Sequence, residues 1–276
     1  MPLAHKEVFM IRIAVAGAAG RMGNRIVVLS REYPELKLVG AFEKKGHDAV
    51  GKDIGLVVGT GEIGVQLSDS LENIIDSVDV IIDFTTPSST KENAILSSKK
   101  GKAMVIGTTG FSKDDLKEIE SSIKSMPCVM ASNMSTGVNL LLRVLHDVAR
   151  VLGDEYDIEI VEAHHRLKKD APSGTALKMA QVIADSTKRS LDEVAVYARK
   201  GLIGERTRKE IGIQTIRAGD IVGEHTVIFG GLGERIEITH KASSRDTFAR
   251  GALRAALWIS GKPAGLYDMQ DVLGLR

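Results

Sequence analysis

The chain of 276 residues contains a single cysteine, Cys128, which excludes an internal disulfide framework and any multi-cysteine metal site. It also lacks a surplus of charge of either sign, because 37 Lys and Arg residues are matched by 36 Asp and Glu residues. A chain without a net positive field has no general attraction for nucleic acid or for an anionic membrane. Any anionic ligand must therefore be held by charges that gather locally.

Long apolar runs are absent as well. No stretch reaches the roughly 18 apolar residues of a membrane span, and the first ten residues lack the apolar core of a secretory signal. We therefore expect a cytoplasmic protein with a short leader and without a membrane segment, and the sequence leaves open whether translation starts at Met1 or at Met10. The hydrophobic content of 43% is typical of a globular protein with its own core.

The first half of the chain alternates short β-branched runs with helical stretches. This alternation predicts a Rossmann-type, doubly wound α/β fold whose parallel sheet is buried on both faces. We expect strands at residues 11–17, 36–43, 78–85, 102–110 and 128–133, and helices at 21–31, after Pro87 and at 112–125.

The pattern changes from Gly137, where a long apolar helix precedes a strand at residues 156–165. Residues 211–242 predict three strands in an antiparallel meander, with Ala-Gly-Asp and Gly-Gly-Leu-Gly at the bends. These features predict an inserted α+β domain built on an open mixed sheet. We place a dinucleotide-binding domain at 1–134, a substrate and oligomerisation domain at 135–245 and a C-terminal return to the first domain at 246–276.

The stretch GAAGRMG, residues 17–23, follows the first strand and begins a helix. Glycine permits the tight turn and the close backbone approach that let N–H groups at a helix start hold a pyrophosphate. Glu43, at the end of the second strand, can accept from a ribose hydroxyl, whereas Lys44 and Lys45 can pair with a 2′-phosphate. Both NADH and NADPH remain open as cofactors. The alternatives are a ligand-free glycine turn and solvated lysines.

Two further loops, FTTP at 84–87 and GTTG at 107–110, follow the carboxyl ends of their strands. Open α/β sheets bind ligands at this edge, so we expect both loops to line the nicotinamide side. Ordinary loops and helix caps are the alternative, since Thr and Gly serve there too.

The stretch EAHHRLKKDAPSGTA, residues 162–176, carries the most chemistry. His164 and His165 end a strand, Lys168 follows in a loop, and Ser173, Gly174 and Thr175 read as the N-cap and first turn of a helix at 174–186. A cation cluster and a helix start are two anion holders, which together predict a substrate with two carboxylates.

The histidines and Arg245 have both functional and structural interpretations. Adjacent histidines on a strand point to opposite faces, and no Cys or further His lies at ligand spacing, so we expect no metal. Arg245 lies between the last strand and the closing helix, where it can fork a substrate carboxylate or pair with Asp246. We expect His146, His225 and His240 to be structural.

Taken together, several motifs closely resemble the dihydrodipicolinate reductase family over nearly the whole chain. They are GAAGRMG, DFTTP, VIGTTG, EAHHRLKKDAPSGTA, RAGDIVGEHTV, GERIEITHKASSRDTFARGA and LWISGKPAGLYDM. The resemblance implies a nucleotide domain made from both chain ends and a homotetramer joined through the inserted sheets. It also implies NAD(P)H-dependent reduction of a cyclic dicarboxylate, 4-hydroxy-tetrahydrodipicolinate, to tetrahydrodipicolinate with loss of water, in bacterial lysine and diaminopimelate biosynthesis.

The resemblance also implies roles for single residues. His164 matches the family's proton donor or acceptor and Lys168 its proton donor, while His165, Gly174 and Thr175 match its substrate contacts. The expected cofactor contacts, with Gly23 and Lys44 added from the glycine-loop pattern, are Gly17, Ala18, Ala19, Gly20, Arg21, Met22, Gly23, Glu43, Lys44, Gly107, Thr108, Thr109, Ala131, Ser132, Asn133 and Met134. Lys44 stands where the family often has arginine, which leaves the preference for NADPH open.

Two alternatives remain at this point. One is another NAD(P)-dependent reductase that acts on an amino dicarboxylate. The other is a dinucleotide-sensing regulator that uses the glycine loop without chemistry. Substitution of His164 or Lys168 separates them, because only a reductase should lose turnover while it retains cofactor binding.

Overall fold

The computed structural model describes residues 10–276, which form two compact units. Unit 1 contains the chain up to Ser135 together with Asp246–Arg276, and unit 2 is Thr136–Arg245. The expected leader, at residues 1–9, lies outside the described residues. Within residues 10–276, no helix is long and apolar enough to cross a bilayer.

Unit 1 is built on a seven-stranded sheet in the order β12-β6-β5-β4-β1-β2-β3, in which every pairing is parallel. The direction of winding reverses between β1 and β4, which creates the crevice where open sheets bind ligands. The fold class predicted from the sequence is confirmed. The strands are β1 (Ile11–Ala16), β2 (Leu36–Phe42), β3 (Leu67–Ser68), β4 (Val80–Asp83), β5 (Ala103–Ile106), β6 (Pro127–Met130) and β12 (Gly265–Tyr267).

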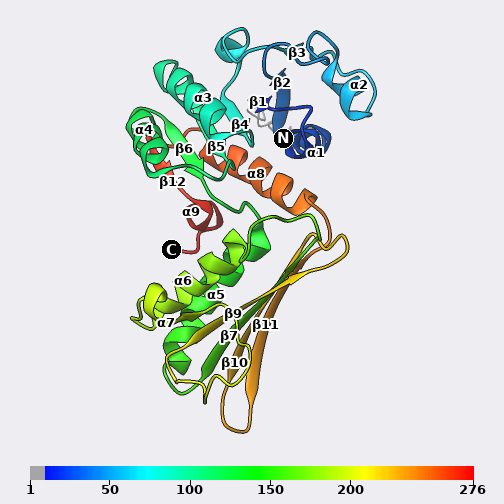
Figure 1. Cartoon of the computed structure of the whole chain (residues 1–276). Helices are drawn as coiled ribbons and strands as arrows, with labels where there is room; N and C mark the ends of the chain where they lie inside the picture. The colour runs from blue at the N-terminus through cyan, green and yellow to red at the C-terminus, as the bar shows by residue number, and fades with distance from the viewer. Residues whose placement is uncertain (1–9) are drawn as a thin grey trace, which may run out of the picture. The chain divides into compact units, whose positions relative to one another are not determined.

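Helices cover both faces of this sheet (Figure 1). Alternate residues of β1 show why: Ile13 and Val15 pack in the core that includes α1 and α8, whereas Ala14 and Ala16 pack in the core that includes α3 and α4. The closing helix α8 lies against β4, β5 and β6, although it is more than 100 residues away in sequence. The helical elements are α1 (Arg21–Ser30), α2 (Ile54–Val58), the 3-10 turn η1 (Ile75–Ser77), α3 (Pro87–Lys99), α4 (Lys113–Ile123), α8 (Asp246–Ile259) and α9 (Met269–Leu273).

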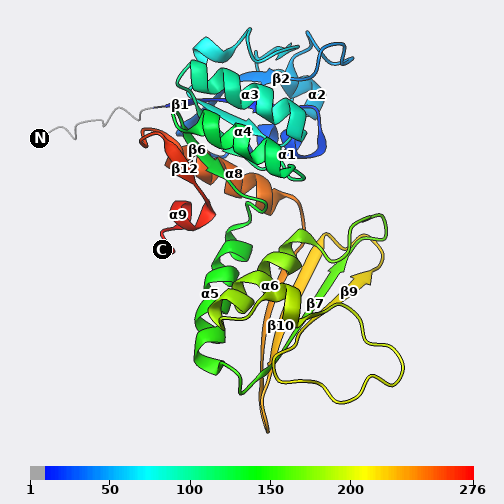
Figure 2. The same cartoon turned by 60° about the vertical axis from the view of Figure 1, so that its left-hand side comes forward.

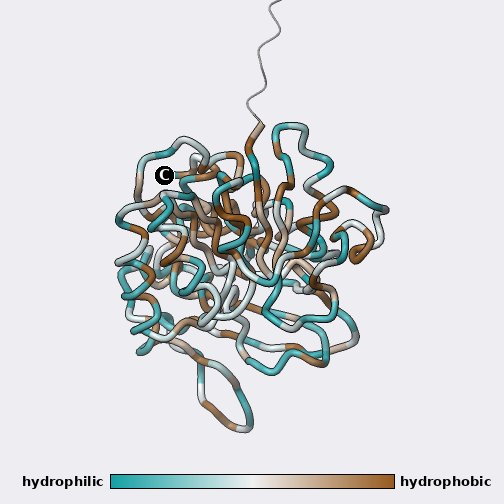
Figure 3. The backbone as a smooth tube through the Cα atoms, turned by 90° about the horizontal axis from the view of Figure 1, so that it is seen from above, coloured by the Kyte–Doolittle hydropathy of each residue, from teal (hydrophilic) through white to brown (hydrophobic). Residues whose placement is uncertain are grey.

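Unit 2 has a five-stranded mixed sheet in the order β11-β10-β7-β9-β8. The long helices α5 and α6 lie side by side on one face of this sheet (Figure 2). Apolar stretches alternate with polar loops along the chain (Figure 3). The elements are α5 (Thr136–Leu152), β7 (Asp157–His164), α6 (Gly174–Ser186), α7 (Leu191–Val194), β8 (Ala195–Val196), β9 (Ile211–Arg217), β10 (Gly223–Gly230) and β11 (Arg235–Ala242).

The predicted three-stranded meander is wrong. β10 and β11 form an antiparallel hairpin, but β9 pairs with β7 in parallel and not with β10. β7 therefore lies between them, and residues 218–222 cross its end. Two strand spacings amount to about 10 Å, which five residues span easily. The sequence pattern correctly identified the three segments as strands. It contained no information that β7 lies between β9 and β10.

A polar group continues the apolar stripe of β7. Ile158 and Ile160 are buried beneath the helices, and the alternation of a strand places Glu162 and His164 on the same face. Thr215 and His225 are the cross-strand neighbours of Glu162 on either side. At the carboxyl end of β7, titratable side chains thus occupy the face on which the rest of the strand has apolar core residues.

Candidate active site

The glycine loop of unit 1 has the shape that a dinucleotide requires. Gly17 has φ +60°, and a Cβ there would lie 2.9 Å from the Cγ2 of Thr85. A Cβ on Gly23 would lie 2.1 Å from the carbonyl oxygen of Gly17, so only glycine lets α1 pack against the loop. Gly20 is the N-cap of α1 and provides no side-chain cap, and the first turn of the helix has no acidic residue. Its N–H groups therefore suit a pyrophosphate.

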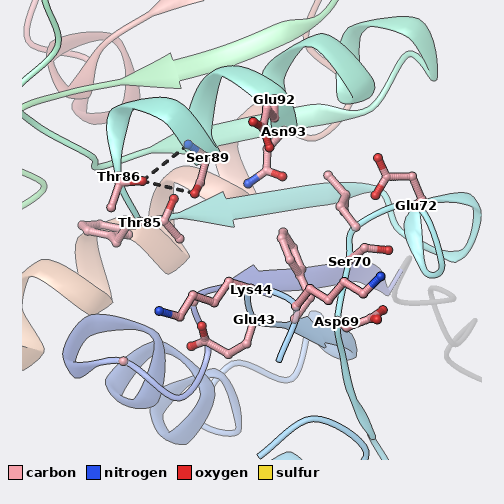
Figure 4. A pocket seen from close by; sticks show the side chains of 16 residues that line it. Glu43, Lys44, Asp69, Ser70, Glu72, Thr85, Thr86, Ser89, Glu92 and Asn93 are labelled. Atoms are coloured by element: carbon pink, nitrogen blue, oxygen red, sulfur yellow. Dashed lines mark hydrogen bonds between the residues drawn. The ribbon is translucent and has the colours of Figure 1, made fainter. Parts of the chain in front are cut away.

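A pocket of about 530 Å³ opens beside this loop. Figure 4 shows Glu43 and Lys44 on one side of it and Thr85 and Thr86, at the start of α3, on another. The Oε1 of Glu43 accepts from the N–H of Ala19 at 3.1 Å, which ties the expected ribose acceptor to the glycine loop. The remaining lining residues are Gly17, Gly20, Phe42, Lys45, Asp69, Ser70, Leu71, Glu72, Phe84, Ser89, Glu92 and Asn93.

Asp83, fully buried at the end of β4, joins the two threonine loops. Its Oδ1 accepts from the backbone and hydroxyl of Thr85 at 2.9 and 2.7 Å and from Thr90 at 3.1 Å, and its Oδ2 accepts from Asn93 at 2.8 Å. Thr108 of the GTTG loop lies 3.3 Å from Oδ1 and 2.8 Å from the hydroxyl of Thr90. The two loops are therefore fixed to each other beside the pocket.

The other expected cofactor residues occupy the same edge of the sheet. A Cβ on Gly107 would lie 2.1 Å from the ring of Phe84, so the ring of one loop covers the backbone of the next. Ala131 follows β6 and donates to the carbonyl of Ile106 at 3.1 Å. Of the remainder, Ala18, Gly23 and Met134 are buried, Met22 and Asn133 are partly buried, and Arg21, Thr109 and Ser132 are exposed.

The centre of unit 2 is a buried carboxylate. Glu162 is fully buried, and its Oε2 lies 2.6 Å from the Nδ1 of His164, whose side chain is 11% exposed. Arg217 holds both oxygens, with Nη1 2.8 Å from Oε2 and Nη2 2.9 Å from Oε1. Burial alone would raise the pKa of Glu162, but the hydrogen bonds from Arg217 and His164 outweigh it and lower this pKa to about 2.

His164 responds to the same surroundings. Burial lowers the pKa of His164 most, the hydrogen bond and charge of Glu162 raise it, and Lys168 and Arg217 lower it further, with a net lowering. Its ring meets that of His225 edge to face, with centroids 5.2 Å apart. The imidazole is therefore neutral in the ligand-free protein near neutral pH and can take up or release a proton when ligands change the local charge.

The loop after β7 brings Lys168 and His165 to the same end of the sheet. The N–H of Lys168 donates to the carbonyl of His165 at 3.1 Å, which closes a turn. The ammonium of Lys168 pairs at 2.9 Å with Asp170, whose side chain is 63% exposed and is therefore an exchangeable partner. The buried Nδ1 of His165 has no hydrogen-bond partner in the described part of the chain. Both side chains suit an incoming carboxylate.

The start of α6 is tied to this cluster. The N–H of Ser173 donates to Oε1 of Glu162 at 3.0 Å, while its hydroxyl caps the helix by accepting from Ala176 at 3.1 Å. Gly174 is exposed, and a Cβ there would meet no atom within 4 Å. The predicted anion-binding turn, which includes Thr175, therefore opens to solvent next to His164.

Arg245 is exposed at the end of unit 2, and the hydrogen bonds described above for the Glu162 cluster do not involve it. Asp246, its alternative partner, accepts from Arg25 through bonds of 2.6 and 2.9 Å, and both expected roles of Arg245 stay predictions. No group of three or more His, Cys, Asp or Glu residues among residues 10–276 could hold a metal ion.

Sequence reasoning missed Glu162, Arg217 and Asp83. A usable signal existed for Glu162, because it stands two residues after Ile160 and two before His164, on the buried face of its strand. No local signal identified Arg217, which lies 55 residues further along the chain.

Family comparisons cover almost the whole chain. The family model described as dihydrodipicolinate reductase, N-terminus, matches residues 11–134, and the model for the C-terminus matches residues 137–273. Two curated relatives named 4-hydroxy-tetrahydrodipicolinate reductase are 57% and 55% identical over 267 residues, which is 97% of this chain and 100% of each relative. They come from Syntrophobacter fumaroxidans and Syntrophus aciditrophicus.

Solved structures agree. The dipicolinate-bound dihydrodipicolinate reductase of Paenisporosarcina sp. TG-14 is 25% identical, with a TM-score of 0.72 over 95% of this chain and 98% of that one. GenD2 from gentamicin A biosynthesis in complex with NAD has a TM-score of 0.60 over 100% of this chain and 93% of that one. At 13% identity, the second likeness concerns the fold alone.

Proposed function

The chain belongs to the dihydrodipicolinate reductase family, and from this premise we propose that His164 and Lys168 handle the protons of its reaction. The protein is a reductase that converts 4-hydroxy-tetrahydrodipicolinate to tetrahydrodipicolinate with loss of water, in lysine and diaminopimelate biosynthesis, and it uses a nicotinamide dinucleotide. The activity and the enzyme class predicted from the sequence are confirmed. The site residues that follow are proposals.

The glycine cradle fits the cofactor, because Gly17 and Gly23 admit no side chain and the start of α1 carries no acid. We propose that this helix start holds the pyrophosphate, and that the loops joined by Asp83 line the nicotinamide side. When bound, the dinucleotide supplies a hydride to the substrate ring. The task of unit 1 is then to orient the cofactor and to keep its two threonine loops in place.

Glu43 and Lys44 bear on the choice between NADH and NADPH. Glu43 suits a free ribose hydroxyl, and Lys44 and Lys45 supply positive charge for a 2′-phosphate at the same pocket wall. Lysine offers a point charge without the planar fork of arginine. We therefore propose that both cofactors are accepted.

The overall reaction consumes one proton and releases one water for each substrate reduced. His164 lies closest to a carboxylate that can support its positive form, and Lys168 has an exchangeable partner in Asp170. We propose that these two groups supply the proton to the ring and assist departure of the hydroxyl. The observation that carries this proposal is the cluster of Glu162, His164 and Lys168 at the carboxyl end of β7.

The two carboxylates of the substrate need two anchors. One is the turn of Ser173, Gly174 and Thr175, which presents a helix start, and the other is the pair His165 and Lys168. Arg245 is proposed as an additional contact. Fixed carboxylates would hold the acceptor carbon in one orientation. We also propose that the protein works in the cytoplasm as a homotetramer joined through the sheets of unit 2.

The experiment is a coupled assay with NADH and, separately, with NADPH. The substrate is generated in place from pyruvate and aspartate semialdehyde by the preceding enzyme, and loss of nicotinamide absorbance is followed. We expect oxidation of both cofactors that depends on the protein and on the generated substrate. Absence of oxidation from a folded protein that still binds the cofactors would overturn the proposed roles. Size-exclusion chromatography with light scattering tests the tetramer.

A further inference from the structure

Glu162 forms hydrogen bonds both with the imidazole of His164 and with the start of α6. Its two oxygens have different partners. Oε2 meets the Nδ1 of His164 at 2.6 Å, and Oε1 accepts from the N–H of Ser173 at 3.0 Å. Thr215 adds a bond to Oε1 at 3.2 Å. One buried carboxylate therefore connects the proposed proton carrier with the proposed substrate anchor.

The protonation of this carboxylate fixes the tautomer of the histidine. Because the pKa of Glu162 is lowered to about 2, both of its oxygens are acceptors near neutral pH. The contact at 2.6 Å then requires a hydrogen on Nδ1 of His164. Nε2, the other ring nitrogen, is left to face a ligand, where it accepts a proton in the neutral ring and donates one in the charged ring.

The neighbour on the next strand leaves room for that nitrogen. Gly223 of β10 has no side chain, and a Cβ there would lie 3.0 Å from the Nε2 of His164. Such a contact is tighter than most real Cβ contacts. Any larger residue at 223 would press on the atom that the mechanism requires.

We propose that Glu162, clamped by Arg217, is a positioning residue that keeps the hydrogen of His164 on Nδ1 and turns Nε2 toward the substrate. This inference rests on the proposed role of His164 as the proton carrier. Through Ser173, the same carboxylate also sets the distance from the imidazole to the turn that binds the substrate carboxylate. Glu162 is fully buried, so it acts through its partners.

The first test measures the tautomer without any substrate. Protein labelled with nitrogen-15 in its histidines is compared as wild type and Glu162→Gln, with the His164 signals assigned from a His164→Gln variant. We expect wild type to carry its hydrogen on Nδ1 and Glu162→Gln to shift it toward Nε2, because an amide can donate to Nδ1. An unchanged tautomer would overturn the proposal.

The second test uses the coupled assay. For Glu162→Gln we expect kcat to fall about 100-fold while KM changes less than threefold, since the cofactor and the anion-binding side chains remain. The groups that face His164 are Glu162 on its own strand, Lys168 in the following loop, Arg217 on β9 and His225 on β10. Loss of the one negative charge among them favours the neutral ring. The pH dependence of kcat should therefore move to lower pH by about one unit.

Two further variants keep the proposal falsifiable. Arg217→Lys retains the positive charge but loses the planar guanidinium that binds both oxygens of Glu162. We expect a smaller fall in kcat, of about tenfold, with the same direction of pH shift. This variant tests the proposal if Glu162→Gln does not fold. Glu159→Gln is the matched control. Glu159 lies on the other face of β7, where its carboxylate accepts hydrogen bonds from both Arg199 and Arg206. It should leave the tautomer and the pH profile of kcat unchanged.

The outcomes separate this inference from the proposed function. If wild type fails to oxidise either cofactor, the proposed function fails, but the tautomer measurement still decides whether Glu162 orients His164. If wild type is active and Glu162→Gln keeps its kcat and its pH profile, the inference fails while the function stands. An equal effect of Glu159→Gln would indicate a general loss of structure and would also overturn the inference.

Discussion

Among the described residues, each unit buries one carboxyl group near the carboxyl end of a core strand, Asp83 in unit 1 and Glu162 in unit 2, and both are 0% exposed. Their partners differ in kind. The groups that donate to Asp83 are neutral hydroxyl, amide and backbone groups. The groups around Glu162 include the guanidinium of Arg217 and the imidazole of His164.

The difference separates two tasks that a buried carboxyl can perform. Neutral donors fix the position of loops and bring no titratable group to the site, which suits a region that only has to hold a cofactor. Charged donors make stronger and shorter bonds and couple the carboxylate to the protonation of its neighbour. In the proposed mechanism, the carboxyl of unit 1 shapes a binding edge, and the carboxylate of unit 2 tunes a proton carrier.

The largest effect should follow from removing that proton carrier. We expect His164→Gln to lower kcat about 100- to 1,000-fold in the coupled assay, because no other side chain is held by Glu162 for proton transfer. Cofactor affinity, measured by nicotinamide fluorescence, should stay within twofold. His146→Gln is the control, since His146 bonds to Ser186 between α5 and α6. Turnover by His164→Gln within threefold of wild type would contradict the assignment.

The corresponding change in unit 1 should act on stability. Asp83→Asn replaces one acceptor oxygen with an amide group, so at least one buried donor loses its partner. We expect the free energy of unfolding to fall by about 2–3 kcal/mol, with weaker cofactor binding, as measured by urea denaturation and fluorescence titration.

The control for Asp83→Asn lies just before the other end of the same strand. Asp79 pairs with Arg12 at 2.6 Å, with side chains 33% and 46% exposed. Asp79→Asn should cost less than about 1 kcal/mol. An equal decrease in the free energy of unfolding for the two variants would mean that the buried hydrogen bonds of Asp83 contribute no more to stability than the exposed ion pair of Asp79.

His225 offers a pH test of unit 2. Burial, with a smaller contribution from the charge of His164, lowers the pKa of His225 to about 4 from its ordinary value of 6.5. Below pH 6.5, His225 is protonated in the unfolded chain but stays neutral in the folded protein. The free energy of unfolding therefore falls as the pH drops toward 4. Between pH 7 and 5 this loss is about 2 kcal/mol. His225→Gln should show a shallower pH dependence of unfolding by that amount, and parallel curves would contradict the prediction.

The smallest effect concerns cofactor choice. Lys44→Ala removes one exposed charge at the pocket wall, so we expect affinity for NADPH to fall about fivefold and affinity for NADH to change less than twofold. Lys37→Ala is the matched control, because Lys37 is exposed near the other end of β2. An equal fall for both cofactors would show that Lys44 does not sense the 2′-phosphate.

Sequence patterns were most informative where structure depends on neighbours in the chain. Five strands of unit 1 (β1, β2, β4, β5 and β6) and the helix at Gly174–Ser186 follow from apolar runs and caps that are local, whereas the short strands β3 and β12 were not predicted. Partners across a sheet are not local. The placement of β7 between β9 and β10, the clamp of Arg217 on Glu162 and the gathering of Thr90 and Thr108 on Asp83 all depend on strand order, which adjacency in sequence does not determine.

The return of the chain end to unit 1 imposes an order on biosynthesis. β12 pairs with β6, and α8 contributes Leu253 and Ile259 to the core against β4, β5 and β6. A ribosome releases all of unit 2 before it releases these residues, and synthesis at about 5–20 residues per second delays them by seconds. During that interval the nascent sheet has an unpaired edge at β6 and an uncovered apolar face. Unit 1, although it begins first, can therefore be completed only after the whole of unit 2 has left the ribosome.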